Sequence, residues 1–237
     1  VIDAADPTSE SRPLTERLRG HEYSAWHHQS TFYIRTNWDA PNFRLMACDD
    51  DATDRSQWRE VLTHKKDVLL RTIAAFDTHL VVEERKNGLR QLRIATWDDP
   101  EGGRPVPAME PVYTAWIGAN PEPHATRLRF GFSSPITPTT TFEVDLVDPV
   151  ELTQLKQEKV GGGFDPAAYR TERRWAEARD GRMIPISITL PAGFEVDGTG
   201  AVYQYAYGSY GHSLDPEFRR DRLSLLDRGI AVAVCHI

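Results

Sequence analysis

The segment Tyr205-Ala206-Tyr207-Gly208-Ser209-Tyr210-Gly211 holds the residues of this sequence that are best suited to chemistry. A phenol hydroxyl can donate a hydrogen bond to an oxygen atom on which negative charge develops during acyl transfer. Residue type alone does not distinguish Tyr207 from Tyr205 or Tyr210 as such a donor. The residues alone also fit the more common case, a buried tyrosine whose hydroxyl has only a structural partner.

No serine of this sequence has the surroundings of a hydrolase nucleophile, which follow the pattern Gly-x-Ser-x-Gly. Around Ser209 the first glycine position is occupied by Tyr207, and the segment Gly131-Phe132-Ser133-Ser134-Pro135 lacks the last glycine. Eight histidines are scattered along the chain, and sequence order alone does not identify a triad. His236 lies in an apolar run and is interpreted as a sheet histidine with structural partners. We therefore expect no complete catalytic triad in these residues.

Two groups of metal-ligand residue types, His27-His28 and Cys48-Asp49-Asp50-Asp51, lack the spacing of metal sites. Zinc sites pair ligands two to five residues apart in two separate segments, and calcium loops alternate their acidic residues. Solvated turns explain both groups better. The sequence predicts neither a metal nor a cofactor.

The elements around the tyrosines predict a βαβ unit. A short strand over Val202–Tyr205 precedes the glycines, with Tyr205 expected to point into the sheet. A helix should follow, with Asp215 as N-cap, Pro216 at its first position and Gly229 as the left-handed C-terminal cap. The apolar run 230–237 then reads as a second, parallel strand.

Residues 1–160 show hairpins rather than helical periodicity, and the first strands of three hairpins start 48 residues apart, at Phe32, Leu80 and Leu128. The dipeptide Asn87-Gly88 tolerates the positive φ of a type I′ turn, which marks the second hairpin strongly. Repeats of this length with several antiparallel strands are typical of propeller blades, and a β-sandwich with coincidental spacing is the alternative. Three units are too few for a ring of ~4 to 8 blades. The paired strands are 32–35 with 43–46, 80–83 with 89–95, and 127–132 with 141–146, preceded by strands at 23–26, 69–74 and 112–117.

The triple glycine Gly161-Gly162-Gly163 is the composition break that we interpret as a domain boundary, between residues 1–160 and 161–237. Beyond it, strands over Arg173–Ala178 and Met183–Leu190 flank the turn Arg179-Asp180-Gly181-Arg182. The nucleophile of such a sheet would come one βα unit after residue 237. Both domains are thus expected to be incomplete.

The segment from Tyr205 to Gly211, followed by Arg222-Leu223-Ser224-Leu225-Leu226-Asp227-Arg228-Gly229, resembles the start of the catalytic domain of prolyl oligopeptidase-type serine peptidases, in particular the oligopeptidase B branch. That branch has Tyr-Gly-Tyr-Gly-Ser-Tyr-Gly here, so Ala206 stands where glycine is usual. Further similar stretches are Gly118–Glu122, Ser133–Pro135 and Gly161–Pro166. The resemblance covers nearly the whole chain.

This resemblance implies the last three blades of a β-propeller, followed by the first part of an α/β-hydrolase domain. It implies a serine oligopeptidase that cleaves short peptides after Arg or Lys through an acyl-enzyme, with residues 1–237 alone inactive. Tyr207 would be an oxyanion-hole donor, and Tyr210 would bind the substrate side chain or, alternatively, only hold the loop. A proline-specific oligopeptidase of the same family is an alternative, although Ser209-Tyr210 differs from the Gly-Phe usual there. A non-catalytic propeller that binds a partner is another.

The composition of the chain limits the classes of molecule that we expect it to bind. The chain has a net charge of −7, 40% hydrophobic and 27% charged residues, which is a globular composition that argues against nucleic acid. No apolar run approaches the ~20 residues of a spanning helix, and the first residues lack a signal-peptide pattern, so no membrane association is expected. Two cysteines indicate reduced thiols. We expect short peptides as partners and a cytoplasmic setting, with a periplasmic one as the alternative.

Overall fold

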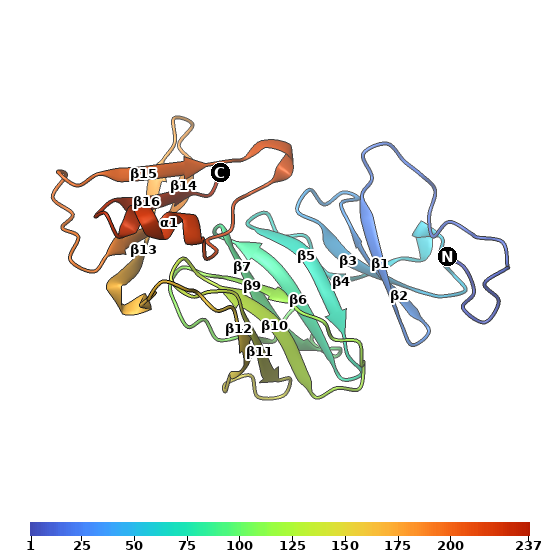
Figure 1. Ribbon diagram of the computed structural model, residues 1–237. Helices are drawn as coiled ribbons and strands as arrows, with labels where there is room; N and C mark the ends of the chain where they lie inside the picture. Colours follow the sequence, from blue (N-terminus) through green and yellow to red (C-terminus); the bar gives the residue numbers. More distant parts are fainter.

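The computed structural model describes residues 1–237, which form four sheets of four strands each (Figure 1). In the first three sheets, consecutive strands are antiparallel neighbours. We name these sheets blades 1, 2 and 3. Blade 1 contains β1 (Tyr23–His28), β2 (Thr31–Thr36), β3 (Arg44–Asp49) and β4 (Arg59–Leu62). Blade 2 contains β5 (Val68–Ala75), β6 (His79–Lys86), β7 (Leu89–Thr96) and β8 (Arg104–Pro105). Blade 3 contains β9 (Thr114–Ile117), β10 (Arg127–Ser133), β11 (Thr140–Asp145) and β12 (Thr153–Gln157).

The blades stack face to face because their strands alternate between two apolar faces. In β6, Leu80 and Val82 point toward blade 1, while Val81 points toward blade 3. The larger core lies between blades 2 and 3 and includes Phe76, Phe130 and Phe132, all at most 1% exposed. A smaller core joins blades 1 and 2. The other face of blade 1 is covered by the N-terminal segment through Leu14.

The hairpins predicted from the sequence are confirmed. The turn between β6 and β7 has φ 53° at Asn87 and 78° at Gly88, as a type I′ turn requires. Each unit also contains a fourth strand, β4, β8 or β12, that the sequence pattern did not predict. The repeat therefore corresponds to complete four-stranded blades.

The fourth sheet follows the triple glycine and has the order β13-β14-β16-β15, which we name the C-terminal sheet. Its first two strands form the predicted hairpin, and β15 pairs parallel with β16. The helix α1 connects these parallel strands and packs against β16 and β14, which confirms the predicted βαβ unit. The bounds are β13 (Tyr169–Glu177), β14 (Met183–Pro191), β15 (Val202–Ala206), α1 (Arg220–Leu226) and β16 (Ala231–Cys235).

The predicted start of the helix is wrong. The helix begins at Arg220, after Arg219 as N-cap, so Asp215 and Pro216 lie in irregular backbone. The side chain of Asp215 instead contacts two arginines of blade 2. The C-terminal end is as predicted, with Gly229 at φ 78°.

Short 3-10 turns, η1 (Arg55–Gln57), η2 (Pro166–Ala168) and η3 (Ser209–Gly211), complete the structure. No helix is both long enough and apolar enough to cross a lipid bilayer. In Figure 1, blade 2 lies between the other two blades, and the C-terminal sheet, in orange and red, lies beside blades 2 and 3.

Candidate functional site

The carboxyl ends of β15 and β16 meet at one edge of the C-terminal sheet. Ala206, the last residue of β15, pairs with Cys235, the last residue of β16. The segment Tyr207–Gly211, which we name the tyrosine loop, leaves the sheet at this edge. Ligands of open α/β sheets bind outside the carboxyl ends of their parallel strands. The segment singled out for its chemistry therefore lies where such a sheet offers a binding site.

The tyrosine loop has a constrained backbone. Tyr210 has φ 57° and Gly211 has φ 70°, so two successive residues are left-handed. For a tyrosine this conformation is unfavourable by about 1–2 kcal/mol. At Gly208, an added Cβ would lie 2.8 Å from the Ile237 side chain, so glycine permits the close passage past the end of β16. Backbone strain of this kind clusters at functional segments, which motivates a functional hypothesis for the loop.

The tyrosine loop carries both of the predicted site residues, and both side chains are accessible. Tyr207 is 39% exposed and Tyr210 is 93% exposed. Tyr205 is also 38% exposed rather than buried in the sheet, and the Arg222 guanidinium of α1 lies 6.0 Å from its ring centre. Ala206 lies within the extended strand β15, a conformation that alanine adopts as readily as glycine.

A buried histidine anchors the chain just beyond the tyrosine loop. His236 is 5% exposed, its Nδ1 lies 2.8 Å from the Leu214 carbonyl oxygen, and its Nε2 lies 2.7 Å from Ser187 Oγ. Since a carbonyl only accepts, Nδ1 carries the proton and Nε2 accepts from the serine hydroxyl. The pKa of His236 is lowered to about 4, mainly by burial and also by the nearby cations Arg173 and Arg85, while the hydrogen bond to the Leu214 carbonyl and the Asp215 carboxylate act in the opposite direction. The ring is therefore a neutral structural link, in agreement with its interpretation from the sequence.

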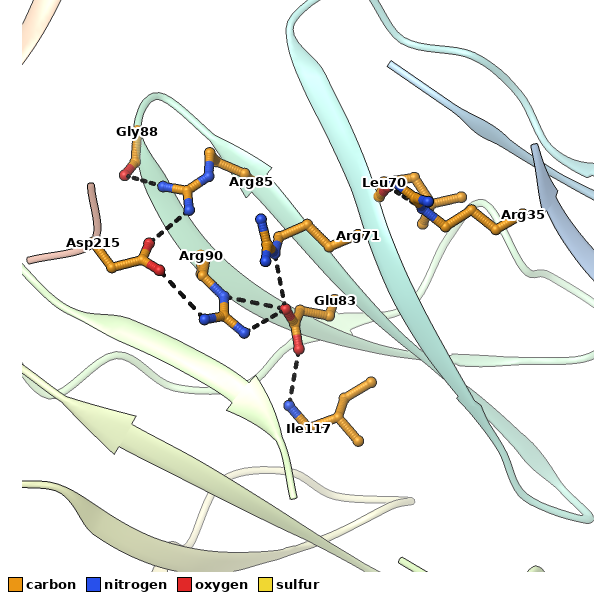
Figure 2. A network of polar contacts seen from close by, with 9 residues as sticks. All are labelled: Arg35, Leu70, Arg71, Glu83, Arg85, Gly88, Arg90, Ile117 and Asp215. Carbon is orange, nitrogen blue, oxygen red and sulfur yellow. Dashed lines mark hydrogen bonds and ion pairs between the residues drawn. The ribbon is translucent and has the colours of Figure 1, made fainter. Parts of the chain in front are cut away.

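The residue after Leu214 pairs with the propeller (Figure 2). Asp215 Oδ1 lies 2.7 Å from Arg85 Nη2, and Asp215 Oδ2 lies 3.3 Å from Arg90 Nη1. Arg90 also binds Glu83, whose side chain is 4% exposed and accepts further hydrogen bonds from Arg71 Nε and from the Ile117 backbone N–H. A chain of charges thus runs from the core of the propeller to the segment that follows the tyrosine loop.

Other contacts join the same two parts. The Phe218 backbone N–H donates to Ser133 Oγ of blade 3 at 2.9 Å, and Arg173 donates to the Asn87 carbonyl at the tip of the β6–β7 hairpin. At Gly88, the residue after Asn87, an added Cβ would lie 2.8 Å from the His236 Cβ, so the hairpin tip approaches His236 closely. The contact between the propeller and the C-terminal sheet is therefore mainly polar and is centred on the β6–β7 hairpin.

Sequence reasoning did not find this charged contact, although two signals were present. Glu83 follows the apolar residues Leu80, Val81 and Val82 in a buried strand, which is unusual for an unpaired carboxylate. Arg85 and Arg90 stand on either side of the Asn-Gly turn, where a two-residue turn places them directly opposite each other. Opposed like charges are unfavourable, so they indicate an anion supplied from elsewhere.

The blades match the family model described as the prolyl oligopeptidase N-terminal beta-propeller domain, over residues 1–158. The chain belongs to the prolyl oligopeptidase family. Among members of this family, the chain is 41% identical over 226 residues to dipeptidyl aminopeptidase BI of Pseudoxanthomonas mexicana, covering 94% of this chain and 31% of that protein.

Solved structures of the prolyl oligopeptidase family superpose on both the blades and the C-terminal sheet. Oligopeptidase B from Leishmania major matches with a TM-score of 0.80 and 33% identity, over 92% of this chain and 32% of the other. The closed form of oligopeptidase B from Trypanosoma brucei, with covalently bound antipain, matches with a TM-score of 0.82 and 29% identity, over 94% and 32%. The chain spans about a third of the length of these relatives.

Proposed function

We propose that residues 1–237 are part of a serine oligopeptidase that hydrolyses short peptides after Arg or Lys through an acyl-enzyme. Residues 1–160 contribute blades of the propeller, and residues 161–237 begin an α/β-hydrolase domain. The propeller restricts access to short, unstructured peptides. The nucleophile comes from the remainder of the protein, and the reaction uses no metal or cofactor.

The observation that carries this proposal is the similarity to oligopeptidase B from Leishmania major, at 33% identity and a TM-score of 0.80. Because it extends over 92% of this chain, it reaches beyond the blades into the C-terminal sheet. The parallel strands β15 and β16 supply the kind of edge at which α/β-hydrolases place their nucleophile. The absence of a Gly-x-Ser-x-Gly sequence within residues 1–237 fits a nucleophile located elsewhere.

In the proposed mechanism, Tyr207 donates its hydroxyl hydrogen to the oxyanion of the tetrahedral intermediate. A donor fixed at the point where negative charge develops stabilises the transition state more than the ground state. The position of Tyr207 directly after β15, at the carboxyl edge of the sheet, supports this role. The constrained backbone of the tyrosine loop limits how far the donor can move.

Tyr210 is proposed to contact the side chain of the substrate residue before the cleaved bond. Tyr210 is 93% exposed and has a left-handed backbone, so its ring is accessible to a substrate. The face of an aromatic ring attracts the planar guanidinium of arginine and, less strongly, the ammonium of lysine. A preference for Arg and Lys follows from this contact.

A second candidate is a dipeptidyl aminopeptidase, favoured by the 41% identity to the protein of that name from Pseudoxanthomonas mexicana. Such an enzyme needs a free amino terminus two residues before the cleaved bond. An oligopeptidase accepts a blocked amino terminus. The two functions therefore differ in whether a blocking group abolishes cleavage.

The test uses the full-length protein with three fluorogenic substrates: a blocked arginyl peptide, a blocked prolyl peptide and an arginyl dipeptide with a free amino terminus. We expect efficient release from the blocked arginyl peptide, together with covalent labelling by a serine-directed phosphonate. Release only from the unblocked dipeptide would favour the second candidate. Residues 1–237 alone should show neither labelling nor release, and labelling of this piece would contradict the proposal.

A further inference from the structure

The segment His212–Arg219 has no regular secondary structure, yet it is fixed at closely spaced points. The Leu214 carbonyl accepts from His236, Asp215 pairs with two arginines of blade 2, and the Phe218 N–H donates to blade 3. This segment begins directly after the tyrosine loop, and Asp215 is four residues beyond Gly211. Whatever holds the segment in place also limits the positions of the tyrosine loop.

The two arginines that pair with Asp215 are held in place by contacts within blade 2. Arg85 and Arg90 are direct cross-strand neighbours on β6 and β7. Arg90 is fixed by Glu83, and Arg85 donates to the Gly88 carbonyl at 3.2 Å. Both side chains are largely buried, at 10% and 19% exposure. The β6–β7 hairpin therefore presents a rigid, doubly cationic receptor to the C-terminal sheet.

The charges within this cluster do not balance without Asp215. Within the cluster of Figure 2, the propeller carboxylate of Glu83 pairs with Arg71 and Arg90 but not with Arg85. Arg85 has Asp215 as its only carboxylate partner. Like charges directly opposite each other across a sheet repel, and an unpaired buried charge is strongly unfavourable. The positive charge of Arg85 is thus paired with a carboxylate only when the segment that carries Asp215 lies against blade 2.

We propose that Asp215 is a positioning residue, through which docking of the propeller hairpin holds the tyrosine loop in its catalytic position. The proposal rests on the proposed function in assigning chemistry to the loop. Arg85 and Arg90, which lie 130 and 125 residues before Asp215 in the chain, then act on catalysis without touching the substrate. The propeller has a second role beside restricting access, because its blade 2 completes the geometry of the hydrolase site.

The test compares the full-length protein with its Asp215→Asn variant, which keeps the side-chain shape and removes the charge. We expect kcat for the blocked arginyl peptide to fall about 10- to 100-fold with KM changed by less than about threefold, because a displaced donor weakens the transition state more than substrate binding. Amide hydrogen exchange at His212, whose N–H donates to the Ser209 carbonyl oxygen of the tyrosine loop, should become at least about tenfold faster, since the loop loses an anchor. Both quantities are measured at matched folded fraction.

Glu143→Gln is the matched control. Glu143 is a carboxylate of similar exposure, 22% against 18% for Asp215, and also contacts two arginines, Arg127 and Arg129, but entirely within blade 3. It should change neither kcat nor exchange at His212. Arg85→Met removes the pair from the propeller side and should reproduce the effects of Asp215→Asn, which also covers the case in which Asp215→Asn does not fold.

The outcomes separate this proposal from the proposed function. If kcat and His212 exchange of both variants stay within twofold of the wild type, the positioning role is wrong, whatever the enzyme cleaves. If the full-length protein cleaves no arginyl peptide, the proposed function fails, and the exchange measurement alone decides whether Asp215 anchors the loop. A loss of kcat with unchanged exchange at His212 would also contradict the positioning role.

Discussion

Tyr207 illustrates what a single residue can and cannot reveal before its surroundings are known. The resemblance to prolyl oligopeptidase-type peptidases implied an oxyanion-hole donor at this position, and the structure places Tyr207 directly after β15, at the carboxyl edge of the sheet. The oxyanion partner that would define its role is part of the bound reaction intermediate. That role therefore stays a proposal, which kinetics can test.

In the full-length protein, Tyr207→Phe removes the hydroxyl and keeps the ring. We expect kcat to fall about 10²- to 10³-fold, equivalent to roughly 2.7–4 kcal/mol, because the loss acts on the transition state. Tyr205→Phe is the control, since that ring lies near Arg222 of α1. Equal kcat for Tyr207→Phe and the wild type would end the oxyanion assignment.

His236 gives the fold a pH dependence whose sign follows from its pKa. The pKa is about 4 in the folded state and 6.5 for an ordinary histidine, so the unfolded chain binds the extra proton between these values. The stabilisation is complete above pH 6.5 and is lost as the pH falls toward 4, by about 3 kcal/mol in total. Denaturant unfolding of the wild type and of His236→Gln between pH 4 and 7 checks this. The free-energy difference between the two proteins should shrink as the pH falls, and a constant difference would contradict the account.

At the scale of elements, the strands with apolar alternation or a turn dipeptide beside them could be predicted from the sequence, and the strands without such a pattern could not. The β6–β7 hairpin has apolar alternation and an Asn-Gly turn, and both strands were found. The outermost strands lack such signals: β8 has two residues, and every residue of β12 is exposed. They form because an already folded neighbour offers its free hydrogen-bonding edge. The start of α1 was mispredicted for a related reason, since Asp215 pairs with Arg85 and Arg90, which are 130 and 125 residues away in the sequence.

The tip of the β6–β7 hairpin is expected to be sensitive to any added atom. Gly88→Ala places a Cβ at φ 78° and 2.8 Å from the His236 Cβ, whereas Gly181→Ala places one at φ 80° in the β13–β14 turn with its nearest neighbour at 3.9 Å. Both variants have the same left-handed strain. Gly88→Ala should lower the free energy of unfolding by about 1–3 kcal/mol more than Gly181→Ala, because of overpacking. Equal denaturation midpoints would show that the hairpin does not approach the C-terminal sheet as closely as described.

At the scale of the whole molecule, the chain combines two kinds of contact. The blades are joined by continuous apolar cores, whereas the propeller meets the C-terminal sheet through ion pairs and backbone hydrogen bonds. Polar contacts between domains are typical of parts that move relative to each other. The 48-residue repeat made the blades predictable, because each repeat folds against its neighbour. The domain contact was not predictable, because it depends on pairs such as Arg85 and Asp215 that no local pattern links.

In the proposed function, this chain is part of a peptidase that cleaves inside short peptides after basic residues. The most direct test is mass-spectrometric mapping of the products that the full-length protein releases from blocked peptides of about twenty residues containing Arg, Lys and Pro, with a folded protein of the same composition as control. The account predicts cleavage after Arg and Lys in the peptides and none in the folded protein. Cleavage only after Pro, removal of dipeptides from unblocked ends alone, or no cleavage at all would contradict it.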